Sequence, residues 1–304
     1  MAFLRGPVMG TFVGVLFAVN TVFCFIPIII LSLIKRLMPS KHLERLLARA
    51  NDGCAQSWVG CNKVLAATLL PTRYDIRGVE TLDKSAQYFI CSNHQTWNDI
   101  HVLQQTFYGK APFFKFFLKQ ELIWVPVLGL AWWGLDFPFM RRSTPEQIAK
   151  NPALKGKDIE TTRRTCEKYE GIPVAIFNFL EGTRFTQAKH AQQASPYRHL
   201  LKPKAGGFAF TLSAMGGRLH SLLDVTIVYP EGAKTFGQFL CGRVERVMVD
   251  VRQHEIPAAF AHGDYEGDAA FRKTVQDYVA ALWAEKDLRI ETLLAEARAG
   301  RFKS

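Results

Sequence analysis

The stretch Gln87–Asp99, QYFICSNHQTWND, is an apolar run that leads directly into a polar island. The apolar part, Gln87–Ser92, predicts a strand. Pro173–Leu180 repeats the arrangement and is followed by Glu181–Arg184, EGTR. Polar groups that follow several strands at one sheet edge are the site pattern of α/β domains.

Strand and helix candidates alternate along the rest of the chain. Strands are predicted at Tyr74–Val79, Gln87–Ser92, Leu135–Met140, Pro173–Leu180, Leu222–Tyr229 and Val244–Val251. Helices are predicted at Lys41–Leu70, Thr144–Tyr169, Lys204–Met215 and Asp264–Arg298, the last with Phe271, Val275, Tyr278 and Leu282 on one face. The alternation predicts an α/β domain in which helices flank the sheet.

Composition favours a membrane-associated protein. The net charge of +11 over 304 residues favours a polyanionic partner, either nucleic acid or an anionic membrane surface. No basic helix, zinc module or aromatic-basic sheet signature of a nucleic-acid binder is present, so no nucleic-acid partner is expected. The six cysteines lack metal-ligand spacing, so we expect free thiols in a reducing compartment and no bound metal.

The N-terminus predicts a membrane anchor. Residues 7–34 carry no charge, and about 20 apolar residues suffice to cross a bilayer. The basic residues Lys35, Arg36, Lys41 and Arg45 follow, which places the remainder of the chain in the cytoplasm by the positive-inside rule. We therefore assign residues 1–40 to the anchor and residues 41–304 to one globular domain, because no linker or repeat interrupts the later part.

Two features leave the membrane geometry open. Asn20 and Pro27 interrupt the apolar stretch, so a straight tilted helix and a re-entrant hairpin are both compatible with it. Residues 111–139 are rich in aromatic side chains, with Lys115 and Lys119 among them. Rings interleaved with lysines suit the membrane–water boundary, but they equally suit a core or an acyl-chain tunnel.

His94 and Asp99 form the first candidate pair, of the form H-x-x-x-x-D. Five residues at about 100° each would put them about 140° apart on a continuous helix, so contact requires a turn between a strand ending near Asn93 and a helix starting near Asn98. In that geometry Asp99 fixes the imidazole tautomer and leaves the other nitrogen free as a base. No G-x-S-x-G elbow is present, which favours a base that activates a substrate hydroxyl.

The second island carries groups suited to phosphate. Gly182 permits close backbone approach, Thr183 offers a hydroxyl, and Arg184 supplies a planar fork of donors. Glu181 could orient Arg184 or bond a substrate hydroxyl. Two further predicted strands also end in polar or turn residues, Arg141 after the first and Pro230 after the second. Each of these motifs alone is as well explained by a capped strand end or a surface salt bridge.

Together the blocks resemble the PlsC-like glycerolipid acyltransferase superfamily. The matching blocks occur in the family's order: Asn93, His94 and Asp99; Phe137–Arg141; Phe179, Glu181, Gly182, Thr183 and Arg184; and Ile227–Pro230. Longer stretches are similar to bacterial YihG-type acyltransferases: Phe117–Gln120 with Trp124–Pro126, Gly156–Arg164, and Leu201–Gly207. One departure is Thr96, where many members carry serine, and the hydroxyl is kept.

The resemblance implies a mixed sheet flanked by helices and an enzyme that moves an acyl group from acyl-CoA or acyl-ACP to the sn-2 hydroxyl of a lysophospholipid. It makes His94 the base and Asp99 its orienting partner, and it assigns the acceptor to Arg141, Glu181, Gly182, Thr183, Arg184 and Pro230. No cofactor or metal is implied, since a thioester is already activated. The implied location is the cytoplasmic face of a bacterial inner membrane.

Several alternatives to 1-acylglycerol-3-phosphate as acceptor stay open at this point. Lysophosphatidylglycerol, lysophosphatidylinositol and lysocardiolipin would suit the same motifs. So would a catalytically silent membrane protein that binds lipid with this fold, although such a protein would be expected to lose His94 or Asp99, and both are present.

Overall fold

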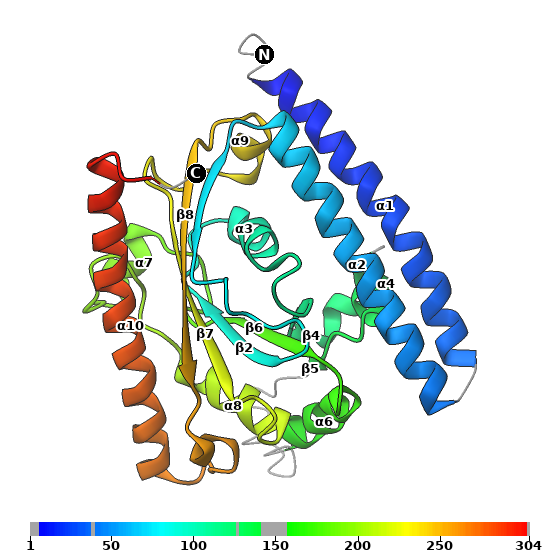
Figure 1. Cartoon of the computed structure of the whole chain (residues 1–304). Coiled ribbons are helices and arrows are strands. Elements are labelled where there is room, and N and C mark those ends of the chain that lie inside the picture. The colour runs from blue at the N-terminus through cyan, green and yellow to red at the C-terminus, as the bar shows by residue number, and fades with distance from the viewer. Residues whose placement is uncertain (1–5, 38–39, 126–127, 141–156, 303–304) are drawn as a thin grey trace.

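The computed structural model describes residues 6–37, 40–125, 128–140 and 157–302. Its centre is a mixed six-stranded sheet with the strand order β1-β8-β7-β2-β6-β3 (Figure 1). Neighbouring strands are parallel except for β7 and β8, which are antiparallel. The strands are β1 (Arg73–Arg77), β2 (Gln87–Ser92), β3 (Phe114–Phe116), β6 (Val174–Phe179), β7 (Ser221–Val228) and β8 (Arg246–Glu255). The predicted mixed α/β fold is confirmed.

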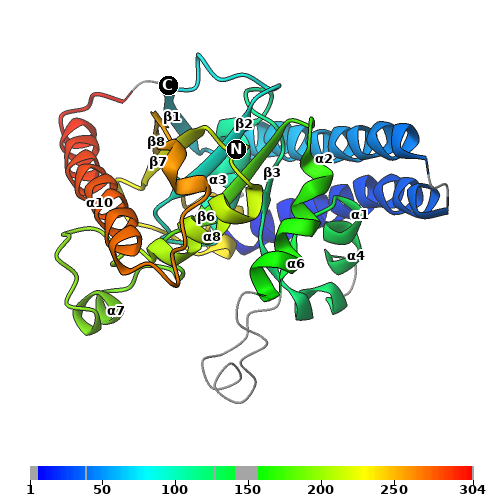
Figure 2. The ribbon, with the colours of Figure 1, turned by 90° about the horizontal axis from the view of Figure 1, so that it is seen from below.

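Helices cover both faces of the sheet, as Figure 2 shows for α10 (Ala269–Arg298) on one side and the pair α1–α2 on the other. The side chains of β2 explain why its sequence does not alternate. Phe89 and Cys91 belong to the core beneath α8 (Ala205–Met215) and α10, whereas Tyr88 and Ile90 belong to the core beneath α3 (Asn98–Phe107). Both faces of this strand exclude water, so the four positions from Tyr88 to Cys91 are all apolar.

Helix α1 (Pro7–Leu37) is continuous through Pro27 and packs antiparallel to α2 (Lys41–Leu69), which agrees with the straight-helix alternative and not with a re-entrant hairpin. Within the described residues it is the one helix long and apolar enough to cross a membrane. Asn20, a polar interruption in the apolar stretch, faces α2 and donates to the side chain of Asn62 at 2.8 Å. Its polarity is therefore satisfied inside the helix pair.

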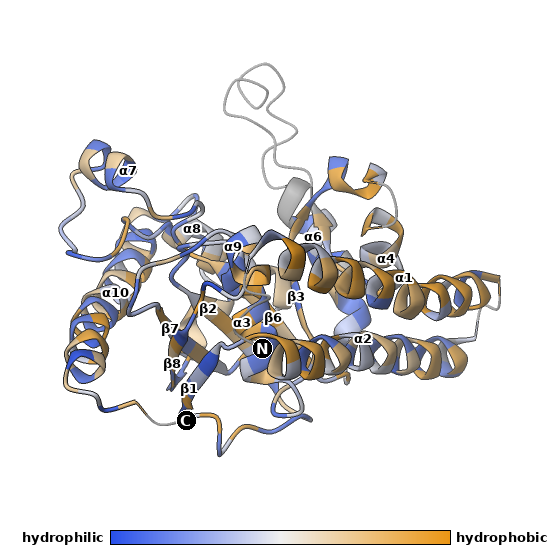
Figure 3. Ribbon diagram, turned by 90° about the horizontal axis from the view of Figure 1, so that it is seen from above, coloured by the Kyte–Doolittle hydropathy of each residue, from blue (hydrophilic) through white to orange (hydrophobic). Residues whose placement is uncertain are grey.

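Most of α1 carries the hydrophobic colour in Figure 3, and its exposed side chains are apolar apart from Thr11 and Arg36. The inner face contacts the globular domain: a Cβ on Gly10 would lie 2.5 Å from Cys241 Sγ, next to α9 (Phe236–Leu240). The other end of α1 approaches α4 (Leu128–Gly134), where Lys35 forms a 2.7 Å ion pair with Asp136. The exposed apolar stripe consists of Val8, Phe12, Val15, Val19, Val22, Phe23, Ile26, Ile30, Leu33, Ile34 and Leu37.

The structure departs from the predicted elements around residues 111–140. Only Phe139–Met140 (β5) of the predicted strand 135–140 is extended, and it pairs with β4 (Leu118–Lys119) in a separate two-stranded sheet. Asp136 explains the difference, because its φ of +58° turns the chain at the end of α4. Of the helix predicted at Thr144–Tyr169, the described part is α6 (Lys157–Cys166) and a 3-10 turn; residues 141–156 lie outside the described residues.

Candidate active site

His94 and Asp99 meet across the turn between β2 and α3. Their contact is 2.9 Å between His94 Nδ1 and Asp99 Oδ2, which confirms that a strand end and a helix start must separate them. The end of β2 is fixed by Asn93, whose side-chain amide donates to the carbonyl of Ile227 and accepts from its N–H, both at 2.9 Å. Because β7 runs beside β2, these two bonds tie the His94 turn to the end of the neighbouring strand.

Asp99 is held by four hydrogen-bond donors. Its Oδ2 accepts from the N–H groups of Gln95 at 2.6 Å and Thr96 at 2.9 Å as well as from His94, and its Oδ1 accepts from the hydroxyl of Tyr229 at 2.7 Å. The side chain is fully buried. A carboxylate in this setting accepts a hydrogen bond from the Nδ1–H group of His94. Nε2 is then the ring nitrogen that carries no proton, and it is free to act as a base.

The imidazole of His94 is also held from one face. The ring of Phe179, the last residue of β6, stacks on it with 3.7 Å between centroids and 12° between planes. Two strand ends and one helix start therefore fix its position, and Nε2 faces a cavity rather than the protein interior. Such pre-orientation is what a general base requires.

Glu181 lies beneath the site and not in the cavity. Its two carboxylate oxygens accept from the backbone N–H of His94 and of Leu201, each at 3.0 Å, and the side chain is buried. Burial raises the pKa of Glu181 to about 7, although the two amide bonds oppose that shift. We conclude that Glu181 joins the His94 turn to the loop before α8, and that contact with a substrate hydroxyl is not its role in this structure.

The turn that follows β6 presents the remaining predicted groups to the cavity. Gly182 has a φ of +67° and donates its N–H to Phe179, which closes the turn. Thr183 and Arg184 line the same wall as His94. The guanidinium of Arg184 lies 5.1 Å from the ring centroid of Trp97, a cation–π distance that directs it along the rim.

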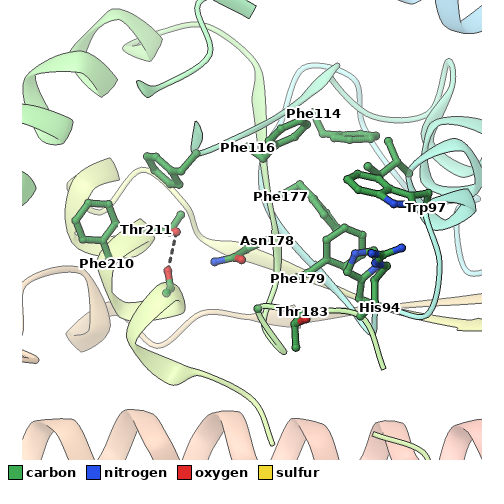
Figure 4. A pocket seen from close by; sticks show the side chains of 15 residues that line it. His94, Trp97, Phe114, Phe116, Phe177, Asn178, Phe179, Thr183, Phe210 and Thr211 are labelled. Atoms are coloured by element: carbon green, nitrogen blue, oxygen red, sulfur yellow. Dashed lines mark hydrogen bonds between the residues drawn. The ribbon is translucent and has the colours of Figure 1, made fainter. Parts of the chain in front are cut away.

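The cavity measures about 370 Å³, and its walls are mostly aromatic (Figure 4). It passes around the edge of the sheet beside β6: Phe177 and Phe179 belong to the α3 side, whereas Asn178 approaches Gly207 of α8. An apolar cavity with a base and an arginine at one end can hold a long hydrocarbon group near a charged head. Its lining is His94, Trp97, Ile100, Phe114, Phe116, Phe117, Phe177, Asn178, Phe179, Gly182, Thr183, Arg184, Gly207, Phe210 and Thr211.

The aromatic segment 111–139 proves to serve more than one purpose. Phe114, Phe116 and Phe117 line the cavity, whereas Phe137 is buried in a separate core cluster beside α1 and α2. Trp124 points into solvent with 85% of its surface exposed. The sequence could not separate these roles, because each uses the same residue type.

Another predicted residue, Pro230, does not line the cavity. Pro230 occupies the second position of a turn closed by the hydrogen bond from the N–H of Gly232 to the carbonyl of Tyr229, where proline is favoured. It thereby shapes the strand exit that carries Tyr229. Arg141 lies outside the described residues. Among the described residues no group of three histidine, cysteine, aspartate or glutamate side chains could hold a metal ion.

Tyr229 is the functional residue that the motifs missed. Burial beside Asp99 raises its pKa far above the usual value, so the hydroxyl stays protonated and donates. The sequence feature that could have pointed to Tyr229 is its position immediately before Pro230, where a predicted strand ends. Because Asp99 Oδ1 accepts this hydroxyl, Tyr229 fixes the plane of the carboxylate that holds His94.

Replacing Tyr229 with phenylalanine should lower kcat about 10-fold with little change in KM, since a bond to a buried charge is worth about 1.5–3 kcal/mol. The negative charge left on Asp99 would bind the protonated imidazole more tightly, so the acid limb of the pH–rate profile should move to higher pH. Tyr74→Phe is the matched control, because the Tyr74 hydroxyl is buried without a hydrogen-bond partner. Equal kcat values and profiles in the two variants would contradict the role of Tyr229.

Comparison with known proteins finds similarity to acyltransferases. Residues 73–236 match the family described as Acyltransferase. Over 121 residues the chain is 28% identical to 1-acyl-sn-glycerol-3-phosphate acyltransferase gamma of Mus musculus, covering 37% of this chain and 30% of that protein. Over 152 residues it is 24% identical to 1-acyl-sn-glycerol-3-phosphate acyltransferase 3 of Arabidopsis thaliana, covering 46% of this chain and 37% of that protein. The chain thus spans about a third of the length of these relatives.

One solved structure is also similar. It is the crystal structure of the 1-acyl-sn-glycerophosphate (LPA) acyltransferase, PlsC, from Thermotoga maritima, with a TM-score of 0.46 and 15% sequence identity. The alignment covers 89% of this chain and 96% of that one.

Proposed function

Because the chain belongs to the acyltransferase family, we propose that it transfers a fatty acyl group from acyl-CoA or acyl-ACP to the sn-2 hydroxyl of 1-acylglycerol-3-phosphate, giving phosphatidic acid. The observation that carries the proposal is the free Nε2 of His94, which opens on an aromatic cavity with Arg184 on the same wall. The named relatives, which act on 1-acyl-sn-glycerol-3-phosphate by their descriptions, support the choice of acceptor.

The reaction follows from the positions of these groups. Nε2 of His94 takes the proton of the acceptor hydroxyl while the oxygen attacks the thioester carbonyl, forming the new C–O bond. Asp99 stabilises the imidazolium that results, and its four donors keep it from rotating. When the tetrahedral intermediate collapses, the C–S bond breaks and the thiolate leaves with the proton that His94 returns.

The cavity is the proposed site for the acyl group of the donor, and the turn Gly182–Arg184 is the proposed site for the acceptor. The aromatic walls formed by Phe114, Phe116 and Phe177 suit the hydrocarbon part of the acyl group. Arg184 can bind the acceptor phosphate with two parallel N–H···O bonds. This placement puts the reacting hydroxyl between the phosphate group and the thioester, within reach of His94.

The direct test is a transfer assay with the purified chain in detergent or lipid vesicles. Oleoyl-CoA and 1-oleoyl-glycerol-3-phosphate are supplied, CoA release is followed with a thiol reagent, and phosphatidic acid is identified by mass spectrometry. Formation of both products in equal amounts is expected. Hydrolysis of oleoyl-CoA without phosphatidic acid, or binding of lipid without any CoA release, would overturn the proposal and favour the silent lipid-binding alternative.

We also propose that the outer stripe of α1 anchors the chain to the cytoplasmic face of a membrane. Side chains of that stripe such as Val15 and Val19 are more than half exposed, which is costly in water. Arg36, which is exposed near the end of the helix, suits anionic headgroups.

The anchoring proposal predicts that detergent, and not about 1 M salt, releases the protein from membranes, because salt screens charges but leaves apolar burial intact. The double variant Val15→Glu/Val19→Glu should shift the protein to the soluble fraction. Val64→Glu, which changes an exposed valine of α2, is the matched control and should leave it bound. Release of the unmodified chain by salt alone would show that the attachment is electrostatic.

A further inference from the structure

Two lysines to which no role has been assigned, Lys189 and Lys204, lie against the turn Gly182–Arg184. Nζ of Lys189 donates to the Thr183 hydroxyl at 2.6 Å and to the Arg184 carbonyl at 3.2 Å. Nζ of Lys204 would lie 3.0 Å from a Cβ placed on Gly182. Gly182, Thr183 and Arg184 line the same cavity as His94, so both ammonium groups lie next to residues of its lining.

The backbone holds both lysines in place. Lys189 lies in the short helix α7 (Gln187–Gln192), whose first turn is capped by the Thr186 side chain. The N–H of Lys204 donates to the carbonyl of Leu180 at 2.7 Å, directly before α8 begins. The two lysines follow the turn at separate places in the chain and are held by different backbone bonds, so they do not depend on each other for position.

Three positive charges gather here without a described carboxylate to neutralise them. Within residues 6–37, 40–125, 128–140 and 157–302, neither Arg184, Lys189 nor Lys204 forms an ion pair within 4.0 Å. Glu181 is the carboxylate nearest in sequence, but both of its oxygens are bound by backbone amides. A bound anion would supply the negative charge that the described residues do not.

We propose that Arg184, Lys189 and Lys204 form a site for a doubly charged phosphate, so that the charge of the headgroup selects the acceptor. A terminal phosphomonoester carries between about 1.5 and 2 negative charges at pH 7, because its second pKa is about 6. A phosphodiester, as in lysophosphatidylglycerol or lysophosphatidylinositol, carries one. Three cations match the monoester, and Lys189 and Lys204 supply the charge that a single arginine lacks. This inference rests on the proposed acyl transfer.

The experiment compares acceptors in one assay. Values of kcat/KM are measured with 1-oleoyl-glycerol-3-phosphate and with 1-oleoyl-phosphatidylglycerol for the unmodified chain, Lys189→Gln, Lys204→Gln and Lys204→Arg. Lys202→Gln is the matched control, an exposed lysine of the same loop with no described side-chain contact. Thermal unfolding of each variant is recorded, so that a loss of folding is separated from a loss of recognition.

The unmodified chain should prefer the monoester by about 100-fold. Lys189→Gln and Lys204→Gln should each lower kcat/KM for the monoester about 10-fold and for the diester about 2-fold, because only the monoester uses the extra charge. Lys204→Arg should retain most of the preference, and Lys202→Gln should retain all of it.

A pH series gives a second, independent readout. The ratio of the two kcat/KM values cancels the ionisation of the catalytic base, which both acceptors share. This ratio should rise between about pH 5 and pH 7 as the monoester gains its second charge, and Lys204→Gln should flatten the rise.

The outcomes separate this inference from the proposed function. If both acceptors react equally well, or if Lys189→Gln and Lys204→Gln lower both kcat/KM values by the same factor, the dianion site is wrong while acyl transfer stands. If neither acceptor releases CoA with the unmodified chain, the proposed function itself fails. A preference for the diester would overturn the charge argument directly.

Discussion

Replacement of His94 with alanine should lower the rate of CoA release about 1,000-fold, the middle of the range for loss of a general base, which is about 10²–10⁴-fold. The loss should appear in kcat, because the cavity walls and Arg184 that bind the substrates are unchanged. The fold should survive, since the neighbouring contacts of the turn are made by the backbone of residue 94: its N–H donates to Glu181, and its carbonyl accepts from Phe185. The stopped-time thiol assay measures the effect.

Two further variants sharpen this result. Asp99→Asn should lower kcat about 100-fold, because an amide oxygen can replace Oδ2 geometrically but cannot stabilise the imidazolium by charge. His220→Ala removes an exposed histidine at the start of β7 and should leave the rate unchanged. Full activity of the His94→Ala protein would exclude His94 as the base. If the variant loses both its activity and its cooperative unfolding transition, His94 has a structural role instead.

Replacement of Lys286 with methionine should lower the free energy of unfolding by about 3–5 kcal/mol, which is the largest stability effect that we expect from a single side chain. Lys286 of α10 is fully buried and forms a 2.7 Å ion pair with Asp224 of β7. It also donates to the Val225 carbonyl at 2.6 Å. Without it, the Asp224 carboxylate would stay buried with no opposite charge, and α10 would lose one of its polar attachments to the central sheet, although the Arg289–Asp250 ion pair would remain.

Chemical denaturation in detergent measures the effect, and two variants test its cause. Lys273→Met removes a lysine from an exposed i,i+4 pair with Asp277 on the same helix and should cost less than about 1 kcal/mol. The double variant Lys286→Met/Asp224→Leu should recover most of the lost stability, because it removes both charges from the interior. A double variant no more stable than Lys286→Met would show that packing, and not the uncompensated charge, sets the loss.

Local sequence signals predicted the elements whose pattern is long and strong. The apolar runs at 87–92 and 173–180 correspond to β2 and β6, and α8 and α10 lie within or match their predicted ranges. The face of α10 is also confirmed: Val275 and Leu282 are buried, and Phe271 and Tyr278 pack against the same core. These features depend on neighbours within a few turns of the chain, so periodicity is sufficient to find them.

Short elements escaped prediction for a physical reason. β3 and β4 contain three and two residues, and β5 is only the last two residues of the strand predicted at 135–140. Such runs are too short to show a period, and they lie in an aromatic-rich segment whose residue types suit a core, a cavity or a membrane surface equally. Their extended form comes from pairing with β6 and with each other. A partner strand, and not the local sequence, decides such a conformation.

The sequence alone determined that His94 and Asp99 require a turn between them, because helical geometry is fixed by the backbone and allows no other contact. It also determined the order of the polar strand exits and the apolar N-terminal segment. Only the tertiary structure decided which distant groups meet there. The hydroxyl of Tyr229 reaches Asp99 across 130 positions of sequence because β7 lies beside β2. The tertiary structure also places Glu181 beneath the site and Lys204 against Gly182. Strand order and the path of the loops set both positions, and neither of these can be read from the residues next to Glu181 or Lys204.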